Sequence, residues 1–399
     1  MMNDLVDKGS PVKPPEYRQV VAPSDPLGRY DLQSDAAFWR LFWHPVCTVR
    51  ELRASSYGGR GPLETTLLGE RIVVAEMGGA VRAFADRCPH RGSSLCLGWL
   101  EESTIRCRYH GWCFDETGAC VDIPSLGEGE PIPARARLTA YDCEVAYDLV
   151  WVRMDGSAGT SIPGFPAWED DSQVCIMGEP YLWPASAGRR VENFIDVSHF
   201  PYAHQGTLGA PPLTRFPEFP VDQAGGELQW RTETFLAFNP GDATYGPPTG
   251  PESVMLPPAT YAVTMPLTVR LDFNWSAERA TQIFMHPTPV DSENCRSYWF
   301  TCHTADGSPD EEHLALQSLV LTEDLPVVAT HQPRAIGHLR DEVSVPADKP
   351  VVLWRRWLWE LIQASREGGA AVADALAVAR LEAGDGARTE GDRQLVGPE

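Results

Sequence analysis

The sequence has no long hydrophobic run. No stretch approaches the roughly 20 consecutive apolar residues that a membrane span requires, although hydrophobic residues make up 43% of the chain. The opening residues, Met1 to Leu5, carry neither the basic nor the apolar region of a secretory signal. We therefore expect a cytoplasmic protein with no membrane partner.

Basic residues are also scarce. The chain has 33 lysines and arginines against 55 aspartates and glutamates, which gives a net charge of −22. Nucleic-acid phosphates are bound by clustered lysine and arginine side chains. This charge balance argues against a nucleic-acid partner.

A disulfide framework is absent as well. Ten cysteines are scattered over 399 residues, whereas disulfide-dense domains are small and secreted. Two of them, Cys88 and Cys107, belong to the motifs described below. The other eight are expected to be reduced thiols: Cys47, Cys96, Cys113, Cys120, Cys143, Cys175, Cys295 and Cys302.

Two short segments each combine one cysteine with one histidine. They read Cys88-Pro-His90-Arg-Gly and Cys107-Arg-Tyr-His110-Gly-Trp, with sixteen residues between His90 and Cys107. A Rieske [2Fe–2S] cluster needs this set, since two thiolates hold one iron and two imidazoles hold the other. Structural zinc is the alternative, but zinc sites usually pair Cys with Cys and His with His, and here each pair is mixed. The spacing favours the iron–sulfur cluster.

A second constellation lies about a hundred residues downstream. Asn193, Asp196 and His199 recur at every third residue, which predicts one side of a helix. Pro201 is expected to end that helix, so that the chain turns and His204 converges on His199. Two histidines and a carboxylate form the ligand triad of non-heme Fe(II) oxygenases, with positions left open for O2 and substrate. A histidine pair alone is more often structural, but the upstream motifs give a mononuclear iron a source of electrons.

The carboxylate of this triad must come from elsewhere in the chain. Asp324 follows a helix predicted over residues 311–321, and we expect it to be the third ligand in preference to three other acidic residues, Glu323, Asp310 and Asp341. Asp196 is assigned instead to a hydrogen bond with a ligand histidine, where it would fix the imidazole tautomer. Asn193 is expected near the iron as a weak donor.

Composition and patterning divide the chain into four parts. Residues 1–34 are rich in proline, aspartate and serine without periodicity, which predicts an irregular arm. Residues 35–165 contain short β-rich runs between turn signals and predict an all-β domain with both cysteine–histidine loops at one end. Residues 166–382 mix strands and helices, and residues 383–399 predict a disordered tail. The expected fold class is α+β.

Some elements can be predicted individually. Apolar alternation predicts strands at 270–275 and 281–285. Helical spacing predicts helices at 36–42 and 353–365, in addition to the one named above. A proline- and glycine-rich stretch, 206–258, predicts a long loop that serves as a lid or a pocket wall.

Together the motifs resemble the Rieske non-heme iron oxygenases, the α subunits of aromatic-ring-hydroxylating systems, over about residues 40–365. The Trp43-His-Pro-Val-Cys-Thr-Val segment and the length are most similar to the homotrimeric branch, which includes methylxanthine N-demethylases, vanillate O-demethylase and dicamba demethylase. Ser93 and Tyr109 stand where respiratory Rieske proteins carry an additional cysteine. This difference favours the oxygenases.

The resemblance implies a Rieske [2Fe–2S] domain followed by a helix-grip (START-like) catalytic domain that holds mononuclear Fe(II). It also implies a head-to-tail homotrimer, in which the cluster of one subunit reduces the iron of its neighbour through Asp196. Electrons would come from NAD(P)H through a separate reductase or ferredoxin, since the chain has no flavin, NAD or plant-type ferredoxin motif. The implied function is a terminal oxygenase that uses O2 to hydroxylate or oxidatively N- or O-demethylate an aromatic or heterocyclic small molecule.

Two other functions stay open. A cis-dihydroxylating ring dioxygenase would carry the same metal set, and a non-catalytic Rieske electron carrier with a ligand-binding module would lack the mononuclear iron. Four arginines beside the cluster motifs also allow two interpretations. They form either a positive collar that steers an acidic electron donor or hydrogen bonds within their own loops: Arg87, Arg91, Arg106 and Arg108.

Overall fold

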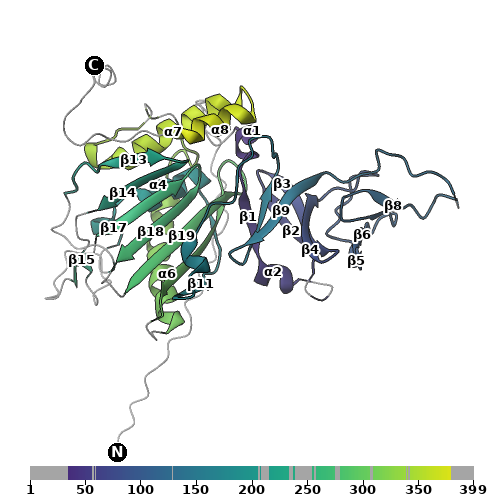
Figure 1. Ribbon diagram of the computed structural model, residues 1–399, viewed down its shortest axis with the longest axis horizontal. Helices are drawn as coiled ribbons and strands as arrows, with labels where there is room; N and C mark the ends of the chain where they lie inside the picture. Colours follow the sequence, from purple (N-terminus) through teal and green to yellow (C-terminus); the bar gives the residue numbers. More distant parts are fainter. Residues whose placement is uncertain are drawn as a thin grey trace, which may run out of the picture.

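The computed structural model describes residues 35–378 apart from 56–57, 59, 128, 205–206, 208–214, 233–236, 239–253, 256–257, 275–278, 306–308, 338 and 340–341. The arm predicted at 1–34 and the tail predicted at 383–399 lie outside these residues, as does Asp341. Two units lie side by side, a small β unit with the cysteine–histidine motifs and a larger unit of sheet and helices (Figure 1). The expected α+β class is confirmed. Within the described ranges, no helix is long and apolar enough to cross a membrane.

The small unit is built on a six-stranded antiparallel sheet in the order β1-β10-β9-β4-β3-β2. These strands are β1 (His44–Thr48), β2 (Leu63–Leu67), β3 (Glu70–Met77), β4 (Ala80–Ala85), β9 (Ala140–Ala146) and β10 (Leu149–Arg153). A four-stranded sheet extends from it and carries the motif loops: β5 (Trp99–Glu101), β6 (Thr104–Arg106), β7 (Cys113–Phe114) and β8 (Cys120–Asp122). Both motif loops therefore sit at the rim of a small sheet.

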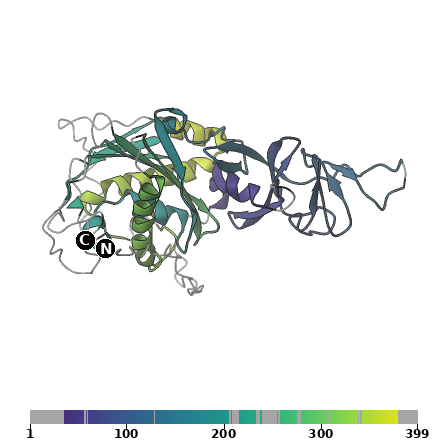
Figure 2. The same ribbon diagram turned by 90° about the horizontal axis from the view of Figure 1, so that it is seen from below.

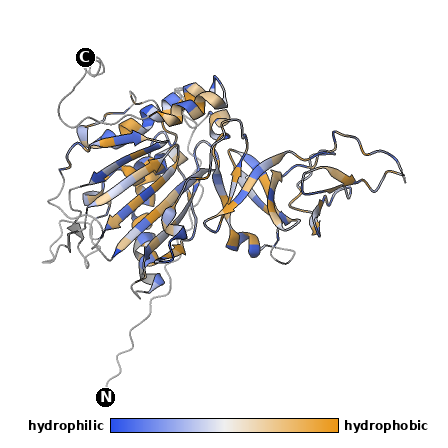
Figure 3. Cartoon of the chain, viewed as in Figure 1, coloured by the Kyte–Doolittle hydropathy of each residue, from blue (hydrophilic) through white to orange (hydrophobic). Residues whose placement is uncertain are grey.

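The large unit contains an antiparallel sheet in the order β11-β20-β19-β18-β17-β14-β13, with β12 also paired to β20. Its strands are β11 (Gln173–Met177), β12 (Tyr181–Trp183), β13 (Val221–Ala224), β14 (Glu227–Thr232), β17 (Ala259–Thr264), β18 (Thr268–Asn274), β19 (Ala280–Pro289) and β20 (Cys295–Thr304). Along β14 buried and more exposed residues alternate, as in a strand with one face in the core. Figure 3 shows the same alternation of hydrophobic and hydrophilic residues across the sheet. Two short strands, β15 (Ala237–Phe238) and β16 (Val254–Met255), pair with each other.

Helices gather on one face of the large sheet (Figures 1 and 2). The helix α4 (Ala187–Ile195) contacts β18, β19 and β20, α6 (Asp310–Val328) packs on α4, and α7 (Lys349–Ser365) reaches β14. The other helices within the described ranges are α1 (Ala36–Trp39), α2 (Val49–Arg53), α5 (Phe200–Ala203), α8 (Gly369–Ala377) and two short 3-10 turns at Pro166–Glu169 and Pro346–Asp348. Ser186 caps α4 by accepting a hydrogen bond from the Arg189 amide at 3.2 Å. This cap fixes where the segment that bears Asn193 and Asp196 begins.

An apolar layer joins the two units. β1 of the small unit contacts β19 of the large sheet, and aromatic residues from both sides share one buried cluster. The rings of Phe284 and Phe300 stack with centroids 4.5 Å apart, and Trp151 of β10 meets Phe284 edge-on. Burial of these rings gives the two units a fixed contact rather than a loose linker.

Several sequence predictions need correction. The helix predicted at 36–42 ends at Trp39, and the one predicted at 311–321 continues to Val328, so Asp324 lies within α6 rather than after it. Much of the long loop predicted at 206–258 lies outside the described residues. Its described part contains β13 and β14, because β13 pairs with β14 and β14 pairs with β17. The strands predicted at 270–275 and 281–285 correspond to β18 and β19, and the helix at 353–365 belongs to α7.

The expectation of reduced thiols is wrong at one pair. Cys175 on β11 and Cys302 on β20 form a disulfide. The two residues are register partners in adjacent antiparallel strands, which places their side chains on the same face and within reach of each other. No spacing pattern predicts this pair, since 127 residues separate the two cysteines.

Candidate metal centres

The two cysteine–histidine motifs form loops of the same design. In the first, the Cys88 amide donates to the Ser93 carbonyl at 2.8 Å and the Gly92 amide donates to the Cys88 carbonyl at 2.9 Å. In the second, the Cys107 amide and the Gly111 amide make the matching bonds at 2.8 and 3.0 Å. Gly92 and Gly111 both have φ of 75°, a left-handed conformation that glycine adopts without strain. Each loop therefore folds back on itself and presents one thiol and one imidazole.

These four side chains meet at the tip of the small unit. Cys88 and Cys107 are buried, and burial together with the neighbouring Cys107 thiol raises the pKa of Cys88 to about 11. The rings of His90 and His110 lie 4.4 Å apart between centroids, and Trp112 stacks on His90 at 4.5 Å. Buried His90 Nδ1 has no hydrogen-bond partner in the described part of the chain. Two adjacent thiols and an unpaired imidazole nitrogen fit the ligand set of a Rieske cluster.

The arginines around this tip divide into two groups. Arg106 pairs with Glu101 and Asp122 and donates to the Gly111 carbonyl at 2.7 Å, so it supports its own loop. The other three are exposed: Arg87, Arg91 and Arg108. A positive collar would therefore consist of these three residues without Arg106.

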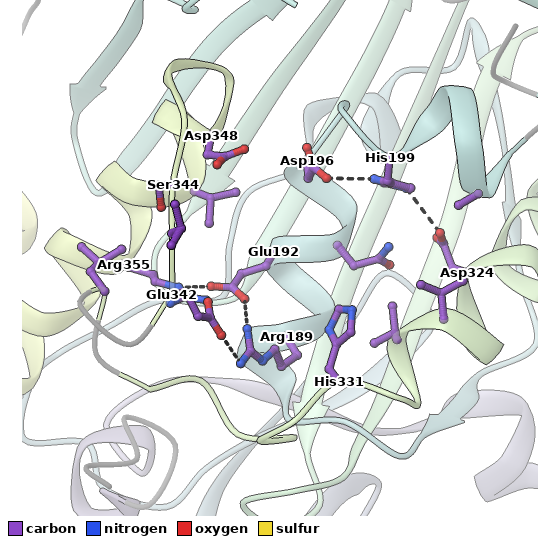
Figure 4. A pocket seen from close by; sticks show the side chains of 17 residues that line it. Arg189, Glu192, Asp196, His199, Asp324, His331, Glu342, Ser344, Asp348 and Arg355 are labelled. Carbon is purple, nitrogen blue, oxygen red and sulfur yellow. Dashed lines mark hydrogen bonds and ion pairs between the residues drawn. The ribbon is translucent and has the colours of Figure 1, made fainter. Parts of the chain in front are cut away.

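In the large unit, α4, α5 and α6 bring two imidazoles and a carboxylate together. His199 Nε2 lies 3.1 Å from His204 Nε2, and Asp324 Oδ1 lies 3.3 and 3.1 Å from these two nitrogens. The three donor atoms are within 4.8 Å of one another. Figure 4 shows His199 and Asp324 pointing toward each other and joined by a dashed line. The structure thus brings together the three side chains that the sequence proposed as a metal triad.

The local path of the chain differs from the predicted one. The helix α4 ends at Ile195, with Asp196 as its C-terminal cap, and His199 precedes the short helix α5. The predicted helix through His199 is therefore wrong, because the backbone of Asp196 is extended. Pro201 lies in the first turn of α5. A backbone N–H at this position would have no acceptor within the helix, so proline is tolerated there. This break between two helices turns His204 back toward His199.

Each imidazole of the triad has a carboxylate on its other nitrogen. His199 Nδ1 donates to Asp196 Oδ2 at 3.2 Å, and His204 Nδ1 donates to Glu323 Oε2 at 2.8 Å. Glu323 also accepts a hydrogen bond from the Thr207 hydroxyl at 2.7 Å. Carboxylate partners of this kind hold a metal-binding histidine in the tautomer that leaves Nε2 free for the ion. The arrangement gives Asp196 the position proposed from the sequence, and it gives Glu323 a role that the sequence analysis did not.

The electrostatics of the triad favour a bound cation. Burial disfavours the charged form of Asp324, but the adjacent imidazoles of His199 and His204 outweigh it and hold the pKa of Asp324 well below its usual range. Burial likewise opposes a charged His199, but Asp196 and Asp324 raise the pKa of His199 to about 9. Buried carboxylates that attract positive charge in this way match the donor set of a divalent iron site.

Asn193 is held by a buried cation. Arg190 Nη1 donates to Asn193 Oδ1 at 2.6 Å, and the Arg190 guanidinium lies 4.5 Å from the ring centre of Trp183. This bond uses one of the two lone pairs of the Asn193 amide oxygen, its only good metal donor, and holds that oxygen beside Arg190. Sequence reasoning missed Arg190, although its spacing of three residues from Asn193 on a helix is a signal for such a pair.

A cavity of about 230 Å³ opens beside the triad and is lined by Asn193, Asp196, His199 and Asp324 (Figure 4). Its wall contains a network of charges in which two arginines each contact two carboxylates: Arg189 and Arg355 with Glu192 and Glu342. Both arginines bridge the same pair of carboxylates, so the network closes on itself. The network links α4, through Arg189 and Glu192, to Arg355 on α7.

Comparison with known proteins shows which class this combination defines. Residues 42–141 match the Rieske [2Fe-2S] domain family, and residues 183–364 match the C-terminal domain of vanillate O-demethylase oxygenase. The chain belongs to the Rieske non-heme iron oxygenases. Members of this class carry a [2Fe–2S] cluster and a mononuclear iron and receive their electrons from another protein, as expected from the sequence.

The particular relatives are bacterial demethylases. The chain is 37% identical over 351 residues to the methylxanthine N3-demethylase NdmB of Pseudomonas putida, which covers 86% of this chain and 96% of the relative. It is 36% identical over 347 residues to the methylxanthine N1-demethylase NdmA of the same organism, covering 86% and 95%. A solved structure of the NdmA QL mutant with theobromine has a TM-score of 0.79 at 35% identity and covers 89% of this chain and all of that one. Dicamba monooxygenase, at 22% identity and a TM-score of 0.66, shares the fold.

Proposed function

We propose that this protein is the terminal oxygenase of a multicomponent system that removes an N-methyl group from a heterocyclic small molecule. The convergence of His199, His204 and Asp324 in a chain whose relatives are N-demethylases carries this proposal. Residues 35–165 are assigned to the Rieske domain and residues 166–382 to the catalytic domain, with the arm at 1–34 and the tail at 383–399 outside both.

Two donor sets would hold the metals. Cysteines and histidines of the two motif loops would bind the [2Fe–2S] cluster: Cys88, His90, Cys107 and His110. His199, His204 and Asp324 would bind Fe(II). When bound, the cluster supplies single electrons and the open-sided iron supplies O2 chemistry.

The reaction balances as a monooxygenation followed by a spontaneous cleavage. The N-methyl group, O2, two electrons and two protons give an N-hydroxymethyl group and water. The C–N bond of that group then breaks, with transfer of the hydroxyl proton to nitrogen, to give the free N–H and formaldehyde. During these steps Asp196 and Glu323 keep the two imidazoles in the tautomer that presents Nε2.

Electron transfer between subunits is part of the proposal. The motif loops lie beside β6, at the end of the small unit that points away from α4 and α6 (Figure 1). At this tip Tyr109 is 64% and Leu97 is 62% exposed, so an apolar surface is available for contact. The cavity beside Asp196 is rich in carboxylates, whereas the tip carries Arg91 and Arg108. These features support a head-to-tail homotrimer in which Asp196 links a neighbour's cluster to the iron.

The decisive experiment combines activity with metal content. The oxygenase, an NAD(P)H-dependent reductase and an N-methylated heterocycle such as caffeine should consume O2 and release formaldehyde. His199→Ala should lower iron content by about one atom per chain and abolish formaldehyde release, while the cluster spectrum stays intact. Asp196→Asn should leave the cluster spectrum intact, should retain iron when the metal is supplied in excess, and should nearly abolish turnover. Normal coupled turnover in either variant would contradict the assignment.

A further inference from the structure

Two hydrogen-bond donors lie buried without an acceptor on the inner face of the large sheet. Trp230 on β14 and Tyr261 on β17 are register partners, so their side chains leave the same face. They are 2% and 0% exposed, and their rings stack with centroids 5.1 Å apart and 5° between the planes. Within the described residues, neither the indole Nε1 nor the phenolic oxygen has a hydrogen-bond partner.

Such a pair is unusual for a folded protein. Buried Trp N–H and Tyr O–H groups usually find an acceptor. A donor that loses its hydrogen bonds to water and makes none within the protein destabilises the folded state. Here two of them stand directly opposite each other on neighbouring strands. Their position points to an acceptor that a bound molecule supplies.

The two donors also lie close to the proposed iron site. α4 contacts the neighbouring strands of the same sheet, and Asp196 forms the end of that helix. Burial, with a smaller contribution from the charge of Asp196, raises the pKa of Tyr261, so the phenol stays protonated and remains a donor. Tyr261 is therefore near the segment that carries His199.

The same cross-strand row continues with aliphatic side chains. Leu271 on β18 is the register partner of Tyr261, and Ile283 on β19 is the partner of Leu271. Both belong to the buried core of the large unit. The row thus combines flat aromatic rings and apolar side chains with two inward donors. This combination suits a planar ring system whose edge carries hydrogen-bond acceptors.

We propose that Trp230 and Tyr261 bind acceptor atoms of the substrate, carbonyl oxygens or unprotonated ring nitrogens on a planar heterocycle. The inference rests on the proposed function, because it assigns these residues to the substrate of the same iron site. An indole N–H can only donate, so the pair selects molecules with acceptors on this edge. It discriminates against ring systems that lack acceptors, because these would leave both donors unpaired.

Binding measurements on conservative variants test this assignment. Tyr261→Phe and Trp230→Phe remove one donor each and keep an aromatic ring. Calorimetric titration of the oxidised, cluster- and iron-loaded enzyme would use caffeine, which has acceptors, and 1-methylindole, which has none in its ring plane. Each variant should bind caffeine roughly three- to tenfold more weakly than the wild type, and the affinity for 1-methylindole should not change.

Two controls separate this role from a structural one. Tyr298→Phe alters a buried tyrosine on the opposite face of the same sheet, where it packs in the cluster between the two units, and should leave caffeine affinity unchanged. The thermal midpoint of Tyr261→Phe should equal or exceed that of the wild type, since the removed hydroxyl has no partner in the described part of the free protein. Trp230→Phe also loses buried volume, so its role is judged by the difference between its caffeine and 1-methylindole affinities.

The outcomes distinguish this inference from the proposed function. Unchanged caffeine affinity in both variants, or a wild type that binds caffeine no more tightly than 1-methylindole, would overturn the inference. Formaldehyde release is scored separately. Caffeine binding that depends on Tyr261 without formaldehyde release would contradict the proposed N-demethylation alone, and formaldehyde release with unaltered variant affinities would contradict the donor pair alone.

Discussion

A buried histidine pair at the junction of the two units should make the protein sensitive to acid. His44 on β1 and His286 on β19 are 0% and 2% exposed, and His44 Nδ1 lies 3.3 Å from His286 Nε2. His44 Nε2 donates to the Trp39 carbonyl at 2.9 Å, and the Thr268 hydroxyl donates to His286 Nδ1 at 2.8 Å. These bonds are all satisfied when both imidazoles are neutral and His286 donates to His44.

The size of the effect follows from the pKa of His44. Burial, opposed in part by the Trp39 carbonyl, lowers the pKa of His44 from 6.5 to about 4, and burial with His44 lowers the pKa of His286. The unfolded chain therefore binds more protons than the folded one below about pH 6.5. Above that pH the two histidines cause no loss in the free energy of unfolding, and this free energy declines as the pH falls toward 4. His44 alone lowers the free energy of unfolding by about 2 kcal/mol at about pH 5, and by about 3 kcal/mol once the pH is below the pKa of His44 in the folded protein.

His44→Gln tests this, because glutamine keeps a donor and an acceptor but does not titrate. The difference in unfolding free energy between about pH 7.5 and about pH 5, measured by urea denaturation, should be about 2 kcal/mol smaller in the variant than in the wild type. His313→Gln, a partly buried histidine on α6, controls for the loss of a histidine as such. If wild type and His44→Gln lose stability equally on acidification, the reasoning is refuted.

Three other perturbations have defined outcomes. Glu323→Gln should weaken iron binding by about 10- to 100-fold, because one ligand imidazole loses its charged partner; metal titration measures this, and unchanged affinity would contradict the assigned role. Gly111→Ala should cost about 1 kcal/mol or more in stability and loosen the cluster loop, since φ is 75° and an added Cβ would meet a proline ring at 3.0 Å. The temperature at which cluster absorbance is lost measures this destabilisation. Gly69→Ala is the control, because Gly69 has φ of 77° and open space around it, so the variant has the backbone strain without the contact to proline. Equal effects of both variants would contradict a contribution from the proline contact. Replacing Arg91 and Arg108 by glutamate should slow association with the electron donor and flatten the salt dependence of the association rate in stopped-flow experiments. Unchanged rates would contradict the positive collar.

Local features could be predicted from the sequence to a large extent. The cysteine–histidine loops are short, and a glycine at the end of each permits the left-handed backbone that a tight turn needs. His199 and His204 are only five residues apart, so a turn between them was sufficient to bring them together. The oxygenase class and its cofactors followed from these motifs and are confirmed by the relatives.

Features that depend on distant contacts could not be predicted in the same way. Asp324 was expected after a helix and lies inside one, and Glu323 was weighed as a metal ligand but hydrogen-bonds to His204 across 119 residues of sequence. Adjacent helical residues point in directions about 100° apart by the 3.6-residue period, so only the packing of α6 decides which carboxylate faces the Nε2 atoms of His199 and His204. Cys175 and Cys302 likewise meet only because β11 and β20 are neighbours.

The sequence by itself determined which side chains are available as metal ligands and which loops present them, because those loops are governed by backbone geometry over a few residues. The tertiary structure alone decided how the imidazoles of His199 and His204 are oriented and which donors on the large sheet lack a partner. Those properties depend on strand register and helix packing between segments far apart in the chain. No local pattern encodes them, because the free energy that fixes them comes from burial shared by the whole core.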